Sequence, residues 1–255
     1  MKIVLLGSGN VASILGQALA EAEHDIIQVW SRKSENAASL ANRLAASFTD
    51  TFTEVLEADV YIIAVSDQAI PTVVSQLPVT KGLVVHTSGA TPLEVFADRF
   101  SSCGVFYPYQ TFSKDRPISF RNVPILLEAK DPSSMLVMEQ IANSLSDRVS
   151  HCNSQQRSAV HLAAAFACNF TNHLYQIADD LLQKEGLHFD IIRPLIRETA
   201  MKVMEHQPVE VQTGPAARND HPTIERHMAL LAGSDDLSAV YSLLTKHILN
   251  NRKIT

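Results

Sequence analysis

Three small residues near the start of the chain, Gly7, Gly9 and Ala12, have the spacing of a dinucleotide-binding turn. They follow the apolar run KIVLL and precede a stretch with helical spacing, so the turn lies between a strand and a helix. Gly7 permits a tight turn, Gly9 lets the backbone approach a pyrophosphate, and Ala12 lets the helix pack closely on the strand. The N-terminus of that helix then faces the phosphates. The alternative is a tight turn without a ligand. We expect cofactor contacts from Gly7, Ser8, Gly9, Asn10, Val11 and Ala12.

The end of the next predicted strand, residues 26–31, indicates which dinucleotide suits the site. An NAD site has an acidic residue there, about twenty residues after the turn, to bind the ribose hydroxyls. This chain has Ser31, Arg32 and Lys33 instead. A hydroxyl and two cations suit the 2′-phosphate of NADP, which an arginine can bind with two hydrogen bonds. The sequence therefore favours NADP over NAD, although the two cations could also form a solvated first turn of the next helix.

Two further predicted strands end in small or polar residues. Ligands of open α/β sheets bind at the carboxyl ends of the strands. We therefore expect further cofactor contacts from Ala64, Val65, Ser66, Thr87, Ser88 and Gly89. His86, which precedes the second group, could donate a proton to a substrate. It could equally be a packed strand residue bonded to the backbone.

The elements that must position these residues form two regions with different patterns. Short apolar runs such as ADVYIIAVS and GLVVHTS alternate with helical stretches as far as about residue 150, which is typical of βαβ units and a mostly parallel sheet. From about residue 154 the strand signal disappears and helical patterns follow. The sequence predicts an α/β fold, with a Rossmann-type dinucleotide-binding domain over residues 1–152. An all-α domain for substrate binding and dimerisation is predicted over residues 153–255.

The first long helical pattern of the second region carries polar residues among small apolar ones. We expect this helix to be buried, and buried polar groups need partners. Those partners could be a substrate and the nicotinamide carboxamide, or structural waters and loop backbone. Of these polar residues, His161 and Asn169 are candidate catalytic residues. Spacings of 4, 4, 3 and 4 residues place five positions on one side of an α-helix: His161, Ala165, Asn169, Asn172 and Gln176.

The segment YPYQTFS, which follows a predicted strand, is expected near the mouth of the crevice. Gln110 and Thr111 are candidate contact residues. Tyr107 or Tyr109 could donate a proton, although tyrosines at such places also simply pack and hydrogen-bond.

The segment TGPAARND, residues 213–220, lies between two helical patterns and contains one cation, Arg218. An arginine on a preformed loop suits a substrate carboxylate, so Arg218 is a further candidate catalytic residue. Asp220 could orient Arg218 or cap the helix that begins near Pro222. The alternative is a capped connector with a surface arginine.

Six stretches together resemble a known family: GSGNVA, SRK, HTSGA, FYPYQTFS, HLAAAFACNFTNHLY and TGPAARNDHPTIERH. It is the family of Rossmann-like bacterial NADP-dependent oxidoreductases with an uncharacterised helical C-terminal domain, related to pyrroline-5-carboxylate reductase and to deazaflavin-dependent NADP oxidoreductases. The resemblance covers nearly the whole chain and implies an NADP-binding N-domain and a dimer-forming C-domain. It names no substrate. Hydroxyisobutyrate-type dehydrogenases have a catalytic lysine four residues before an asparagine. If Asn169 is that asparagine, Ala165 replaces the lysine.

Composition narrows the remaining classes of function. The 255 residues carry a net charge of -6, which argues against nucleic acid or an anionic membrane as the main partner. No apolar run approaches the length of a membrane span, and the start of the chain is interrupted too early to be a signal peptide. The cysteines and histidines lack the spacing of a metal site, and three scattered cysteines suit a reducing cytoplasm.

Our leading hypothesis is an NADPH-dependent reductase of a small carbonyl or imine substrate, which could bear a carboxylate. Two alternatives stay open: a non-catalytic NADP-binding or redox-sensing protein, and an NAD-dependent hydroxyacid dehydrogenase. The apolar long helix also predicts a homodimer formed through the helical domain.

Overall fold

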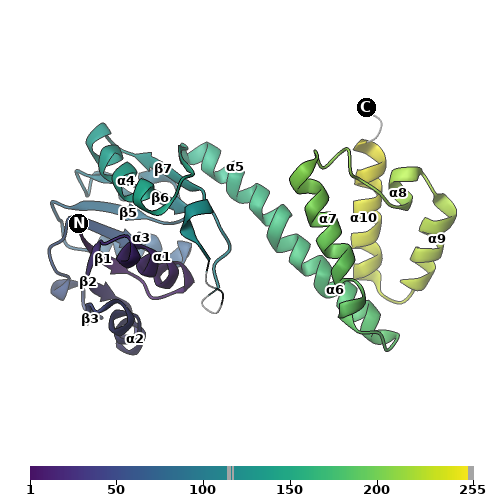
Figure 1. Cartoon of the computed structure of the whole chain (residues 1–255), viewed down its shortest axis with the longest axis horizontal. Helices are drawn as coiled ribbons and strands as arrows, with labels where there is room; N and C mark the ends of the chain where they lie inside the picture. The colour runs from purple at the N-terminus through teal and green to yellow at the C-terminus, as the bar shows by residue number, and fades with distance from the viewer. Residues whose placement is uncertain (114–115, 117, 252–255) are drawn as a thin grey trace. The chain divides into compact units, whose positions relative to one another are not determined.

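The computed structural model describes residues 1–113, 116 and 118–251. The chain forms two compact units, Met1–Thr171 and Asn172–Thr255 (Figure 1). None of the helices in the described part of the chain is long and apolar enough to cross a membrane.

The first unit is built on one eight-stranded sheet with the order β3-β2-β1-β4-β5-β6-β7-β8. All neighbouring strands are parallel except β6 and β7. This arrangement confirms the predicted α/β class with a Rossmann-type sheet. The short strand β3 has no counterpart in the prediction. The strands are β1 Lys2–Leu6, β2 Asp25–Trp30, β3 Ser47–Thr49, β4 Val60–Ile63, β5 Leu83–His86, β6 Cys103–Pro108, β7 Ile125–Ala129 and β8 Val149–His151.

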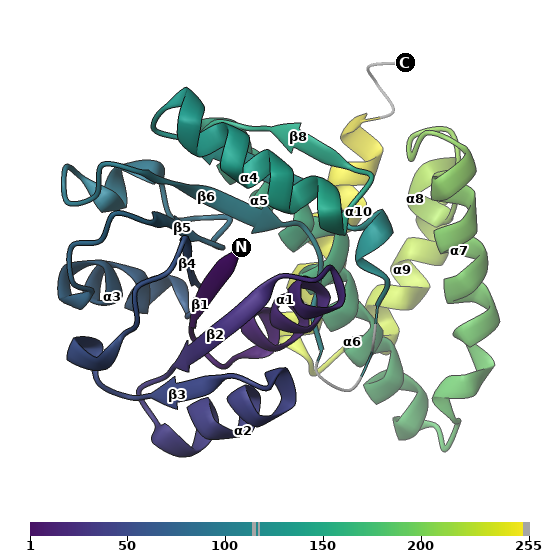
Figure 2. The same ribbon diagram turned by 60° about the vertical axis from the view of Figure 1, so that its left-hand side comes forward.

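Apolar cores lie on both faces of this sheet, because successive side chains of a strand point to opposite faces. Ile3 and Leu5 of β1 belong to a core formed with α1, α2 and α4. Val4 and Leu6 belong to a second core formed with α3. Figure 2 shows α1 and α4 side by side on one face. The helices are α1 Asn10–Glu21, α2 Ser34–Leu44, α3 Ile70–Gln76 and α4 Pro132–Leu145.

The predicted long helix after residue 154 is present, but it is not α-helical throughout. It consists of α5 (Ser154–Ala164), a π-helical segment (Ala165–Phe170) and α6 (Thr171–Lys184). The Thr171 hydroxyl donates to the Phe166 carbonyl at 3.0 Å, five residues back along the chain. Gly186, with φ of 71°, follows the end of the helix as the sequence indicates.

The second unit is all-helical, as predicted, but it has almost no core of its own. The buried apolar residues in its described part are only Ala216, Ala217 and Leu231. Met204 and Leu230, by contrast, are 85% and 82% exposed. The single chain therefore leaves much of the apolar surface of this unit uncovered. Besides α6, its helices are α7 Arg193–Glu205, α8 Pro215–Arg218, α9 His221–Leu230 and α10 Asp235–Asn251.

Candidate cofactor and active site

A cavity of about 720 Å³ lies at the carboxyl ends of β1, β2 and β4. Such a crevice, where the strand order reverses between β1 and β4, is the usual ligand site of this kind of sheet. Eleven predicted cofactor residues line it: Gly7, Ser8, Gly9, Asn10, Val11, Ser31, Arg32, Lys33, Ala64, Val65 and Ser66.

The glycine turn has the backbone geometry that the sequence requires. Gly7 has φ of 137°, and a Cβ placed on it would lie 2.1 Å from the Ala64 carbonyl oxygen. Its N–H donates to the Trp30 carbonyl at 2.8 Å, so the turn joins the ends of three strands. Gly9 is exposed, and a Cβ there would meet nothing within 4 Å. Ala12, predicted as a cofactor contact, is fully buried on the inner face of α1 and does not line the cavity.

The basic strand end lies at the cavity as predicted. The Ser31 hydroxyl lies 2.9 Å from the Ser8 hydroxyl, which links the glycine turn to the end of β2. Arg32 and Lys33 are exposed and form no ion pair within the described residues, so both cations are available to an anion. Asn36 also lines the cavity, one helical turn after Lys33. Asn36 was not among the predicted residues, although its i+3 spacing from Lys33 places it on the same side of the helix.

The YPYQTFS segment is attached to the start of α1. The Asn10 side-chain amide donates to the Phe112 carbonyl at 3.0 Å. The Gln110 side-chain oxygen accepts from the Thr111 N–H at 2.9 Å. Asn10 and Gln110 thus hold the backbone of this segment.

Gly89, Tyr107 and His161 converge at one place in the first unit. A Cβ on Gly89 would lie 2.6 Å from the ring of Tyr107 and 2.7 Å from Nδ1 of His161. The Tyr107 hydroxyl is 3.3 Å from Nδ1 of His161. Nearby, the Tyr109 hydroxyl donates to the Val160 carbonyl at 3.2 Å. Two tyrosines therefore hold the end of α5 against the carboxyl end of β6, over the loop that contains Gly89.

The environment of Tyr107 keeps its hydroxyl protonated. Burial, followed by the neighbouring Tyr109 and Asp67, raises the pKa of Tyr107 to about 12. The phenol therefore stays protonated at neutral pH, and its hydroxyl can donate to Nδ1 of His161 or accept from it. A neutral imidazole that accepts at Nδ1 carries its proton on Nε2. In the tautomer that accepts from Tyr107, exposed His161 therefore presents an Nε2–H donor.

His86 occupies a different environment from the one a proton donor needs. It is fully buried, its ring stacks on Phe96 at 5.5 Å, and its Nδ1 accepts from the Ser88 N–H at 3.2 Å. Burial, followed by the charge of Arg157, lowers the pKa of His86 to about 3. This geometry favours the structural interpretation that the sequence left open. Of its neighbours, Thr87 and Ser88 are buried as well.

The expected single polar face of the long helix does not persist through the π-helical segment. That segment adds about one residue to its turn, so later positions are rotated by about 100° relative to His161. The helix is also not buried in the single chain, since His161 and Asn169 are both exposed. Asn172 and Gln176 line a separate cavity of about 470 Å³ within the second unit.

The TGPAARND segment contains a helical turn that the sequence did not predict. Gly214, with φ of 100°, precedes the short helix α8, which begins at Pro215. Asp220 accepts from the Thr223 N–H at 3.2 Å and so caps α9, one of the two roles considered for it. Arg218 is exposed and forms no ion pair with the described residues.

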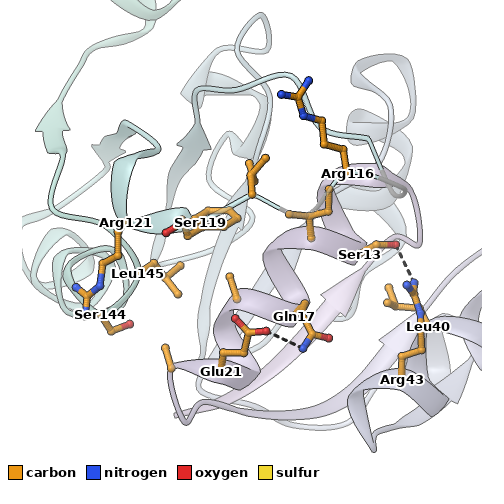
Figure 3. A pocket seen from close by; sticks show the side chains of 15 residues that line it. Ser13, Gln17, Glu21, Leu40, Arg43, Arg116, Ser119, Arg121, Ser144 and Leu145 are labelled. Atoms are coloured by element: carbon orange, nitrogen blue, oxygen red, sulfur yellow. Dashed lines mark hydrogen bonds between the residues drawn. The ribbon is translucent and has the colours of Figure 1, made fainter.

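A further cavity of about 430 Å³ lies between α1, α2, α4, Arg116 and residues 118–121 (Figure 3). It shares no lining residue with the cavity at the glycine turn. Arg43 donates to the Ser13 hydroxyl at 3.2 Å, and Gln17 donates to Glu21 at 3.0 Å. These polar groups satisfy one another, so we assign no ligand to this cavity.

Comparisons with known proteins identify the family of the chain. Residues 2–88 match the family described as NADP oxidoreductase, coenzyme F420-dependent, and residues 123–248 match a domain of unknown function. A Bacteroides fragilis protein classified as an NADP oxidoreductase is 41% identical over 98% of both chains, with a TM-score of 0.92. The chain belongs to this family of NADP oxidoreductases. Family membership confirms both the predicted resemblance and the predicted cofactor, NADP.

More distant structures share the fold. An imine reductase from Myxococcus stipitatus in complex with NADP+ is 16% identical over 100% of this chain and 95% of its own, with a TM-score of 0.71. A 1-pyrroline-5-carboxylate reductase from Streptococcus pyogenes is 14% identical over 98% of both chains, with a TM-score of 0.61. A search of curated proteins gave no match.

Proposed function

We propose that this oxidoreductase uses NADPH to reduce a small substrate with a C=N or C=O bond. The proposal is based on the cavity at the glycine turn, where Ser31 at the end of β2 is followed by exposed Arg32 and Lys33. These side chains suit a 2′-phosphate, and the start of α1 suits a pyrophosphate. Ser66 at the end of β4 and Gly89 after β5 would then border the nicotinamide. When bound, NADPH supplies a hydride to the substrate carbon.

The second requirement of the reaction is a proton for the substrate nitrogen or oxygen. We assign this proton to Nε2 of His161; as it leaves, Nδ1 takes the proton of the Tyr107 hydroxyl at 3.3 Å, so the imidazole stays neutral, and water returns a proton to Tyr107. His161 is exposed and therefore accessible to a substrate, unlike the fully buried His86. Asn169 stays a candidate for a polar substrate contact, and Arg218 for the binding of a substrate carboxylate.

We also propose that the protein is a homodimer. Its second unit buries few apolar residues alone, and Leu162 and Phe166 of the long helix are 60% and 64% exposed. Exposed apolar surface of this extent is typical of an interaction site, and a second copy is the most common partner. Light scattering should give twice the mass of the chain. A monomer at micromolar concentration would contradict this part of the proposal.

A substrate panel tests the proposed reaction directly. Purified protein is mixed with NADPH and cyclic imines, imino acids, keto acids or simple aldehydes, and loss of the nicotinamide absorbance is followed. We expect turnover with at least one C=N or C=O compound, and a large loss of turnover in His161→Gln with unchanged NADPH affinity. Tight NADPH binding without turnover of any compound would favour the alternative of a non-catalytic NADP sensor.

Two further assignments belong to the same proposal. NADPH should bind more tightly than NADH, and tighter binding of NADH would favour the alternative hypothesis of an NAD-dependent hydroxyacid dehydrogenase.

We also propose that the protein is cytoplasmic, because Cys103, Cys152 and Cys168 are all free thiols, as a reducing compartment would keep them.

A further inference from the structure

A buried ion pair lies at the base of α5, one helical turn before His161. The Arg157 side chain is 1% exposed and that of Glu128, on β7, is 15% exposed. Nη1 of Arg157 donates to Oε2 of Glu128. Arginine is rarely buried to this degree, and a buried ion pair adds little net stability over an apolar pair of the same size. The burial of this ion pair therefore needs an explanation other than stability.

The contacts of the pair join three elements of the proposed site. Nη2 of Arg157 donates to the Thr91 carbonyl at 2.8 Å, in the loop that contains Gly89. It also donates to the Ser154 hydroxyl at 3.1 Å, at the start of α5. Glu128 accepts from the Ser154 N–H and hydroxyl, both at 2.9 Å. One guanidinium thus fixes the start of α5 to β7 and to the Gly89 loop.

Ser154 extends the same junction. Its hydroxyl accepts from the Leu93 N–H at 3.1 Å, just beyond Thr91. His161 follows Arg157 on α5, so the direction in which α5 leaves the sheet sets the distance between the His161 ring and Tyr107. The Nε–H of Arg157 is buried and has no partner among the described residues.

We infer that Arg157, through its pair with Glu128, is a positioning residue that sets His161 against Tyr107 and Gly89 for proton transfer. This inference rests on the proposed function for its role in turnover. The inference can also be tested without turnover, because it predicts which ring nitrogen of His161 carries the proton in the resting protein.

The test compares full-length wild type with Arg157→Lys and Arg157→Met. Lysine keeps the charge but cannot serve Glu128, Thr91 and Ser154 together, and methionine removes the charge. We expect turnover to fall about 10-fold in the lysine variant and about 100-fold in the methionine variant, since a displacement of about 1 Å costs about 100-fold. NADPH affinity should stay unchanged, because the cofactor cavity does not include this junction. Arg121→Met is the matched control, since Arg121 pairs with Asp147 in solvent, 61% and 71% exposed.

The second measurement is the ¹⁵N NMR signal of the His161 ring, which reports the tautomer whether or not a substrate is known. Wild type should show an accepting Nδ1 and a protonated Nε2, and the Arg157 variants a mixture of tautomers. If wild type turns over no substrate, the proposed function fails while this measurement still decides the inference. If Arg157→Met does not fold, Ser154→Ala replaces it. Wild-type His161 signals in the folded variants would overturn the inference, as would unchanged turnover.

Discussion

The substitution Gly89→Ala tests the proposed active site most directly. The added Cβ would lie 2.6 Å from Cζ of Tyr107, whereas ordinary contact begins at 3.4 Å. Tyr107 must therefore move by about 0.8 Å, the difference between these two distances. The same Cβ would lie 2.7 Å from Nδ1 of His161, so both partners of the 3.3 Å Tyr107–His161 contact are displaced from their present geometry. A displacement of this size costs about 100-fold in turnover, or about 2.7 kcal/mol of transition-state stabilisation.

The assay combines turnover, NADPH affinity and thermal stability. Gly89→Ala should lower kcat far more than it weakens NADPH binding, measured by nicotinamide fluorescence, because the proposed phosphate contacts at the glycine turn and at Arg32 and Lys33 are unchanged. Tyr107 is half-buried and His161 exposed, so both can move outward and the melting temperature should change little. Gly9→Ala is the complementary control. Its Cβ meets no protein atom within 4 Å but lies where the pyrophosphate must approach, so it should weaken NADPH binding. Unchanged kcat in folded Gly89→Ala would refute the placement of the proton donor.

Two further predictions concern the strand end and the buried histidine. Arg32→Ala should weaken NADPH binding by about 10- to 100-fold, because it removes one charge-assisted hydrogen bond, and should leave NADH binding unchanged. An equal loss of affinity for both cofactors in titrations would contradict a role at the 2′-phosphate. The pKa of His86 falls from 6.5 to about 3 on folding, so the unfolded chain binds the extra proton below pH 6.5. Stability is therefore complete above pH 6.5 and declines as the pH falls towards 3, by up to about 1.4 kcal/mol per pH unit. The free energy of unfolding, measured with urea at pH 7, 5 and 4, should depend less on pH in His86→Phe. The control His206→Gln, at an exposed position, should keep the wild-type pH dependence. An unchanged pH dependence in His86→Phe would argue against a neutral buried ring.

Much of the cofactor site could be predicted because its requirements are local. The turn needs φ of 137° at Gly7, a conformation that L side chains rarely adopt, and the chain places glycine there. Ser31 lies at the end of a strand that pairs with β1, so the βαβ connection itself brings the basic residues to the turn.

The other parts of the site had no local signal. The π-helical segment changes the phase of the long helix, and its small apolar residues resemble any α-helix. The three residues of β3 are too short to give a period-2 pattern. Glu128 and Arg157 are 29 residues apart, and either one alone resembles a surface charge.

The sequence by itself determined the α/β class, the glycine turn, the preference for NADP and the family, because these follow from backbone restrictions and from residues adjacent in the βαβ pattern. Only the tertiary structure decided that His86 lies in the core. It also decided that the His161 ring lies within hydrogen-bond distance of the hydroxyl of Tyr107, 54 residues away in the chain. The physical reason is that both histidines have the same intrinsic chemistry. Burial and hydrogen-bond partners separate them, and these depend on strand order and helix direction, which no short stretch of sequence encodes.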